Sequence, residues 1–240
     1  MSLFTNQSRE MTIAPQCPWY EAQQKYGAPN VNWCEPTRCS YINEPANTWS
    51  NLGFVIVAIY LIKKITDPLV KNFAWVVLVM GLFSGIYHAS NNYLTQFFDF
   101  LGMALMTSFL LAFNVQRFPK NRHSFGILFW FFSFLNMTLL MILDIIDVPV
   151  QTLMLINALP ILILEIVNGT REKSFKKYGQ LASASVTLIL AQIAAQIDLK
   201  RIYCEESNLF LHGHVIWHLL CTVAMYFLAI HIKKNQHTPK

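Results

Sequence analysis

The apolar residues of this chain are gathered into seven long blocks that short polar segments separate. The blocks cover roughly residues 46–62, 73–90, 96–115, 125–143, 148–167, 180–197 and 209–230. Each is close to the ~20 residues that a helix needs to cross the hydrocarbon core of a bilayer. Only 13% of the residues are charged, far below the share that is usual in soluble domains. The pattern predicts an all-α integral membrane protein, a bundle of seven transmembrane helices.

Polar segments flank the membrane region at both ends. Residues 1–45 have no apolar core near their start, so we expect no cleavable signal peptide and expect the first span to act as the insertion signal. Residues 46–232 are expected to form the seven-helix membrane domain, and 233–240 a short basic tail. No internal repeat or interdomain linker interrupts this arrangement.

Basic residues are concentrated in alternate loops. Thirteen of the 18 lysines and arginines fall on one side of the expected helices: Lys63, Lys64, Lys71, Arg117, Lys120, Arg122, Arg171, Lys173, Lys176, Lys177, Lys233, Lys234 and Lys240. The remaining five are Arg9, Lys25, Arg38, Lys200 and Arg201. Because cytoplasmic loops carry the excess of Lys and Arg, the N-terminus is expected outside and the C-terminus in the cytoplasm. These loops account for the formal charge of +5, so no nucleic-acid partner is expected.

The cysteines fit this topology. Four of the five, Cys17, Cys34, Cys39 and Cys204, fall on the side expected to face out of the cytoplasm, and Cys221 lies within the last apolar block. An oxidising compartment permits disulfides. Four cysteines allow three connectivities, which the spacing alone leaves open.

Histidines gather at the same expected depth on two helices. His88 lies near the end of the second block, and His214 and His218 lie near the start of the seventh. Residues four apart share a helix face, so His214 and His218 can face one ion, with His88 as a third ligand. Three neutral imidazoles with one open position are typical of catalytic zinc. Hydrogen-bonded histidines or bis-histidine haem ligation are the alternatives.

The remaining histidines are expected to have no part in this site. His212 comes two residues before His214 and so faces another way, as an interfacial bystander. Three further histidines lie among basic residues and are expected in solvent: His123, His231 and His237.

Two more polar residues belong to the same region. Ser84 precedes His88 by four residues and shares its helix face, and Asp99 follows just inside the third block. A carboxylate in an apolar helix needs a partner, which a metal and its water would supply. The alternatives are an interhelical pair for Asp99 and a hydroxyl bonded back to its own helix for Ser84.

At these residues the chain resembles the alkaline ceramidases, seven-helix members of a superfamily that includes adiponectin-receptor-like and Per1-like proteins. The matching elements are "WCE" at 33–35, "NTWSN" at 47–51 with Glu44 ahead of it, Ser84-x-x-x-His88 followed by Asp99, "ID" at 197–198, "CE" at 204–205 and His214-x-x-x-His218.

The resemblance implies roles for the matching residues. It makes His88, His214 and His218 zinc ligands, and Asp99 and Ser84 the groups that contact the attacking water and the reacting carbonyl. It also pairs Cys34 with Cys204. Cys17 and Cys39 are then left as a second pair, which is an inference of our own.

The resemblance further implies a calcium site in the N-terminal segment. The matching ligands would be Asn32, Trp33 through its carbonyl, Glu35, Glu44 and Asn47. The segment departs from the family pattern, because Asn32 replaces an Asp and Glu44 follows Glu35 more closely. Calcium prefers six to eight oxygen ligands. The alternative is a segment held by Cys34 and by helix-capping contacts of Asn47 and Ser50.

The activity implied is zinc-dependent hydrolysis of ceramide, or a related N-acyl sphingolipid, to a fatty acid and a sphingoid base. The lipid substrate would enter from the bilayer, and no obligate protein partner is expected. The active site would lie near the extracytoplasmic face of a bacterial inner membrane or the lumenal face of an ER or Golgi membrane. A zinc esterase acting on another lipid, and a receptor-like protein without enzymatic activity, are the alternatives.

Overall fold

The structure is a computed structural model that describes residues 12–118, 123–146, 148, 151–173, 175–205, 208 and 210–236. Four residues used in the topology prediction lie outside the described residues, namely Arg9, Lys120, Arg122 and Lys240, and so does His237, which was expected in solvent. The regular structure in the described part is helical. Its elements are α1 (Tyr20–Tyr26), α2 (Pro45–Ser50), α3 (Leu52–Lys64), α4 (Pro68–Ser90), α5 (Tyr93–Gln116), α6 (Phe125–Ile145), α7 (Gln151–Glu172), the short 3₁₀ helix η1 (Phe175–Lys177), α8 (Gly179–Leu199) and α9 (Gly213–Asn235).

Seven helical segments of the described chain are long and apolar enough to cross a membrane, which confirms the predicted bundle. The first of them, Pro45–Lys64, combines α2 and α3, which meet at Asn51. The last begins at Gly213, four residues later than the apolar pattern predicted, because His212 has an extended backbone. The fifth, Thr152–Glu172, reaches beyond the predicted end at residue 167. Its last turns are polar, with Asn168 buried and Thr170 and Arg171 exposed, so apolar character alone did not mark where it ends.

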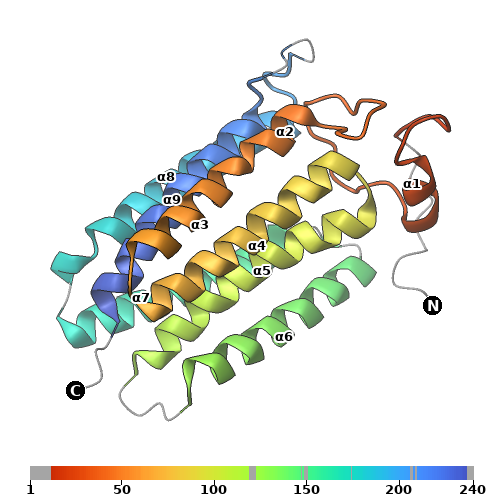
Figure 1. The fold of residues 1–240 in the computed structure, drawn as a ribbon. Helices are drawn as coiled ribbons and strands as arrows, with labels where there is room; N and C mark the ends of the chain where they lie inside the picture. The colour runs from red at the N-terminus through yellow and green to blue at the C-terminus, as the bar shows by residue number, and fades with distance from the viewer. Residues whose placement is uncertain are drawn as a thin grey trace.

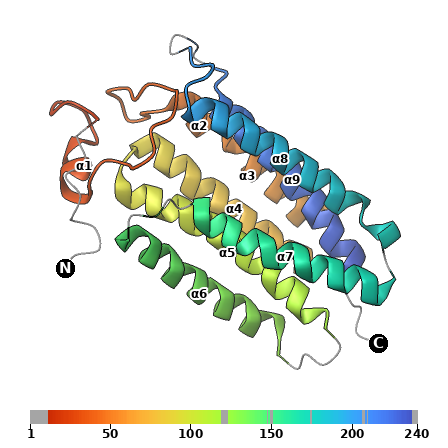
Figure 2. The ribbon, with the colours of Figure 1, turned by 180° about the vertical axis from the view of Figure 1, so that it is seen from behind.

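Helix α5 lies in the middle of the bundle (Figures 1 and 2). It packs against α4, α6 and α7, while α9 packs against α8, α3 and α4. Helix α6 lies at the edge of the bundle away from α8, and α1 sits outside the bundle beside the start of α5. Gly81 and Gly102 let helices approach closely, since a Cβ on Gly81 would lie 2.6 Å from the Phe54 Cβ and one on Gly102 would lie 2.9 Å from the Met80 Cα. Small residues at such crossings are typical of membrane helices.

The two ends of the bundle have different chemistry. At one end, called here the histidine end, α4 finishes and α9 begins, and α1 and α2 lie beside them (Figure 1). At the other, called the basic end, α3, α5, α7 and α9 finish. The basic end carries most of the lysines and arginines in the described chain, among them Lys63, Lys64, Arg117, Arg171 and Lys233.

A buried charged cluster at the basic end, the Arg117 network, consists of Arg117, Glu165, Glu172, Tyr178 and His231. The Arg117 guanidinium donates to Glu165 Oε2 at 2.9 Å, to Glu172 Oε2 at 3.0 Å and to the Tyr178 hydroxyl at 2.9 Å. Glu165 Oε1 lies 3.1 Å from His231 Nε2. The solvent location predicted for His231 is therefore wrong. Its neighbours Lys233 and Lys234 turn outward, while His231 itself faces the carboxylate on α7 and is 1% exposed.

Candidate metal centre

Three buried histidines from two helices meet at the histidine end. His88 lies in the last turn of α4, and His214 and His218 occupy successive turns at the start of α9. Their ligand nitrogens all lie within 4.8 Å of one another, and His88 Nε2 is 3.1 Å from His214 Nε2. In the described part of the chain, no other group of three or more His, Cys, Asp or Glu residues has a spacing suited to a metal. These side chains form the candidate metal centre.

Helix α2 supplies partners for the outward nitrogens of two of these rings. Glu44, just before α2, places its Oε2 atom 2.6 Å from His88 Nδ1. Ser50, at the end of α2, places its Oγ atom 2.6 Å from His218 Nδ1. Because Ser50 donates its single hydroxyl proton to the Asn47 carbonyl at 2.8 Å, it accepts a proton from His218.

This hydrogen-bond network assigns the tautomers of both rings. The accepting hydroxyl on His218 Nδ1 selects the Nδ1–H form, and Glu44 in its ionised form selects the same tautomer of His88. The Nε2 lone pairs then face the centre of the cluster. Metal-ligating histidines usually donate their other ring N–H in this way, which fixes ring orientation.

The third ring, His214, is held by stacking. It lies between Trp33, with ring centroids 3.5 Å apart, and Trp217, at 5.2 Å. Its Nδ1 atom has no hydrogen-bond partner among the described residues. Asp198 fixes the position of this stack, because its carboxylate accepts the backbone N–H of His214 at 3.1 Å and that of Cys34, next to Trp33, at 2.8 Å.

Ser84 and Asp99 line one side of the cluster. Ser84 Oγ is 3.4 Å from His218 Nε2, and the Asp99 carboxyl on α5 lies near enough to the Ser84 hydroxyl to interact with it. Both side chains are largely buried, at 3% and 9% exposed. The structure thus brings together all five residues for which the sequence predicted a catalytic or zinc-binding role.

The three rings suit a small cation with nitrogen ligands. Tetrahedral zinc with Zn–N distances of 2.0–2.1 Å would hold its ligands about 3.3–3.4 Å apart, which lies between the 3.1 Å and 4.8 Å found here. Two Nε2 lone pairs that face each other at 3.1 Å repel unless a proton or a cation lies between them. The donor set therefore fits zinc.

Charge at this end also favours a cation. Glu44 lies just outside the first span, and burial raises its pKa to about 8, although a hydrogen bond from Asn47 partly opposes the shift. Burial likewise raises the pKa of Glu35. A positive ion near either carboxylate would favour its ionised form.

Among the residues expected to bind calcium, Asn47 contacts both Glu35 and Glu44. The Asn32 side chain is exposed, and the two oxygens of Glu35 each accept a backbone N–H at the start of α2, from Ala46 and Asn47 at 2.8 Å. Arg201 donates to the Trp33 carbonyl at 3.5 Å. Only two carboxylates are present, and both serve other contacts, so these residues do not fit the oxygen cage that calcium prefers. Calcium binding stays a prediction from the resemblance.

Two disulfides hold the N-terminal segment. The structure joins Cys34 to Cys204, as the resemblance implied, and Cys17 to Cys39. Cys221 is free and buried within α9. The first bond ties Trp33, which stacks on His214, to the loop before α9.

Several contacts of the centre were not predicted from the sequence. Glu44 and Ser50 were considered for calcium and for helix capping, not as partners of His88 and His218. Trp217 was not considered at all. One sequence signal was available for Glu44, since a carboxylate directly before an apolar span and at the depth of the histidines needs a buried partner.

The fold and the site together define a class: a seven-helix membrane protein with a buried, metal-competent three-histidine centre at one end. A family model described as Ceramidase matches residues 26–239, and the chain belongs to this family. The matched residues include the second cysteine of each disulfide, Cys39 and Cys204. They also include the histidine cluster and all seven candidate spans. No curated protein matches the chain. Family membership and the helical bundle support a ceramidase-like membrane hydrolase.

Proposed function

We propose that the chain is a zinc-dependent amidase of the membrane, which hydrolyses ceramide or a related N-acyl sphingolipid to a free fatty acid and a sphingoid base. The observation that carries this proposal is the convergence of three imidazole Nε2 atoms, two of them with Nδ1 anchored by Glu44 and Ser50. Zinc bound there would polarise the amide carbonyl and make water a better nucleophile near neutral pH.

Asp99 and Ser84 have distinct roles in this proposal. Asp99 accepts a proton from the attacking water and returns it to the nitrogen as the C–N bond breaks. The water oxygen joins the carbonyl carbon, so the products are a carboxylic acid and an amine. Ser84, between Asp99 and His218, donates a hydrogen bond to the carbonyl oxygen as negative charge develops on it.

The lipid would reach the centre from the bilayer. The centre lies where α4 finishes and α9 begins, near one membrane surface, and an amide bond between head group and acyl chain lies at a similar depth. The basic residues gather at the opposite end, so the positive-inside rule supports an extracytoplasmic location for the centre.

The test is fatty-acid release from a panel of ceramides and matched ester lipids. The native chain is compared with Asp99→Asn, which keeps the size of the side chain but removes the base. Asp144→Asn on α6 is the matched control, because it makes the same change in another spanning helix. We expect release from ceramide by the native chain and the control, and none by Asp99→Asn.

Other outcomes separate the alternatives. Equal turnover by Asp99→Asn and the native chain would remove the proposed mechanism. Hydrolysis of esters but not ceramide would favour a lipid esterase. A purified native chain that holds no metal and hydrolyses neither class would favour the receptor-like alternative.

A further inference from the structure

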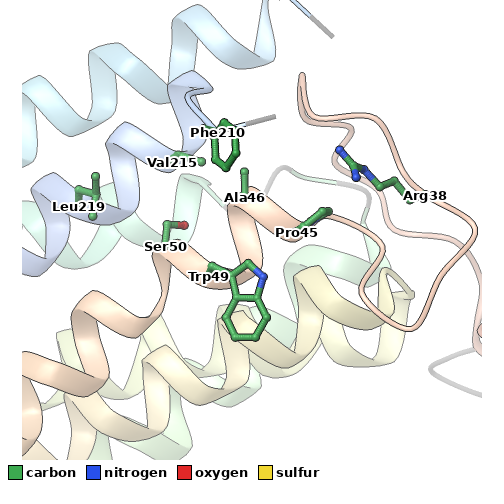
Figure 3. Close-up of a pocket in the computed structure, with 8 residues that line it drawn as sticks. All are labelled: Arg38, Pro45, Ala46, Trp49, Ser50, Phe210, Val215 and Leu219. Atoms are coloured by element: carbon green, nitrogen blue, oxygen red, sulfur yellow. The ribbon is translucent and has the colours of Figure 1, made fainter. Parts of the chain in front are cut away.

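An apolar groove lies on the outside of the bundle between α2 and α9 (Figure 3). Its volume is about 520 Å³, which is within the range of small-molecule sites. Helix α2 contributes Pro45, Ala46 and Trp49 to one wall. The other wall is formed by Phe210, which precedes α9, and by Val215 and Leu219 in the first two turns of α9. The groove does not include Ser84 or Asp99, so it is separate from the reacting side of the metal centre.

The groove faces the bilayer rather than the interior of the protein. Trp49 is 56% exposed and Leu219 is 47% exposed, and both belong to candidate membrane spans. Phe210, which is 82% exposed, lies over the upper side of the groove in Figure 3. An apolar groove at this depth is in contact with lipid, whose acyl chains are the apolar molecules available to fill it.

Arg38 is the charged residue of the groove. It lies seven residues before the first span begins, and so at the level of lipid head groups rather than of acyl chains. Its backbone N–H donates to the Asn43 carbonyl at 2.8 Å, but its guanidinium has no acidic partner in the described part of the chain. Guanidinium groups bind phosphate through paired N–H donors.

We propose that this groove binds an anionic membrane phospholipid, with one acyl chain between α2 and α9 and the phosphate at Arg38. Chemical complementarity carries the proposal: an apolar groove open to the bilayer continues into a cation at head-group level that has no acidic partner among the described residues. A free fatty acid fits less well, because its carboxylate has no spacer to reach beyond the span. The proposal does not depend on the hydrolase activity.

The bound chain would lie next to the metal centre without entering it. Ser50 lines the groove and is 8% exposed, and its hydroxyl accepts the Nδ1–H of His218. An acyl chain in the groove would keep water away from this hydrogen bond. The lipid would thereby protect the orientation of one metal ligand.

The experiment is native mass spectrometry of the full chain released from detergent micelles. The chain is equilibrated with phosphatidylglycerol, with phosphatidylcholine of identical acyl chains, or with oleate. Arg38→Gln removes the cation, and Leu219→Trp fills the groove. Lys200→Gln, which removes an exposed positive charge at the same end of the bundle, is the control. Thermal unfolding confirms that each variant is folded.

We expect the native chain to retain one phosphatidylglycerol about fivefold more tightly than phosphatidylcholine, the effect of roughly one basic residue at a membrane surface. Arg38→Gln should abolish the preference, Leu219→Trp should weaken retention of both lipids, and Lys200→Gln should change neither. Equal retention of the two lipids by the native chain, or an unchanged preference in Arg38→Gln, overturns the proposal. Stronger retention of oleate than of phosphatidylglycerol overturns it in favour of a fatty-acid site.

Discussion

The molecule has two buried polar clusters, one at each end. They differ in which kinds of polar group they place next to one another. In the Arg117 network each ionisable group faces an opposite charge or a hydrogen-bond partner, as in the Arg117–Glu165 and Glu165–His231 pairs. In the metal centre, like groups face each other, with His88 and His214 nitrogens 3.1 Å apart. The first cluster contains its own opposite charges, whereas the second has an arrangement that could hold a metal ion.

This contrast shows how a structural polar cluster differs from a functional one in a membrane protein. Burial of a polar group within a bilayer costs free energy. Such groups are therefore found mainly where they pair with one another or where they serve a function. The outward nitrogens of His88 and His218 are held by Glu44 and Ser50. Their inward nitrogens contact His214 and the Ser84 hydroxyl, neither of which carries a negative charge. Imidazoles oriented from outside towards one another suit a site that binds a ligand.

Removal of two histidines should have the largest effect. The variant His88→Ala with His214→Ala leaves a single imidazole, so bound zinc should fall from about one atom per chain to near zero, and fatty-acid release with it. Inductively coupled plasma mass spectrometry measures the metal. The matched control is His123→Ala, an exposed histidine outside the cluster. Zinc retained by the double variant would contradict the assignment of the centre.

Loss of Arg117 should destabilise the fold and leave the metal in place. Arg117→Met leaves the buried carboxylate of Glu165 without its arginine, which should lower the free energy of unfolding by roughly 3–5 kcal/mol. Unfolding in a denaturing detergent titration measures it. Lys63→Gln removes an exposed cation at the same end and should change stability by less than about 0.5 kcal/mol. If Arg117→Met instead lost zinc while remaining folded, the two clusters would not be independent.

Glu44→Gln should weaken the metal centre without abolishing it. Loss of the carboxylate that accepts from His88 Nδ1 should lower zinc affinity by about 10- to 100-fold, as is usual for partners of metal-ligating histidines. Competition with a chromophoric chelator gives the affinity. Glu21→Gln, an exposed carboxylate on α1, is the control. An unchanged affinity would show that Glu44 has no part in orienting His88.

The same variant also tests the calcium prediction. Calorimetric titration of calcium into the native chain and into Glu44→Gln, both loaded with zinc, measures binding directly. The structure leads us to expect no heat of binding in either, because the Glu35 and Glu44 oxygens already accept hydrogen bonds. Saturable binding by the native chain alone would restore the calcium site that the resemblance implies.

Gly213→Ala should have the smallest effect of these substitutions. The change should be confined to the histidine end. A Cβ there would lie 2.5 Å from the Ala194 carbonyl oxygen and 2.9 Å from the Asp198 Cβ, so α9 must shift away from α8. We expect a loss of about 1–3 kcal/mol in the free energy of unfolding. Gly126→Ala on α6 meets nothing within 4 Å and should be neutral or slightly stabilising. Equal effects of the two would show that α8 and α9 do not need this close approach.

The seven spans and the histidine cluster could be predicted from the sequence because each depends on short-range patterns. Runs of about 20 apolar residues mark spans, and the four-residue spacing of Ser84 with His88 and of His214 with His218 marks helix faces. The orientation of the bundle in the membrane stays a prediction, which depends on the basic loops.

The partners of these residues could not be predicted, because they depend on which helices are neighbours. The sequence around His231 is basic and looks exposed, yet the packing of α7 places Glu165 against it. The role of Glu44 likewise depends on the approach of α2 to the end of α4. Pairing across helices is a property of the packed bundle and leaves no periodic signal in either segment.

The bond between Cys34 and Cys204 has a consequence for the order of biosynthesis. The two cysteines are 170 residues apart, so the bond can form only after α8 and part of the following loop have been made. At ordinary rates of translation this takes roughly 10–30 s after Cys34 emerges. During that time Trp33 has no His214 to stack on, since α9 does not yet exist. Trp33 therefore reaches its final position only after α9 has been made, although it is synthesised more than 170 residues earlier than that helix.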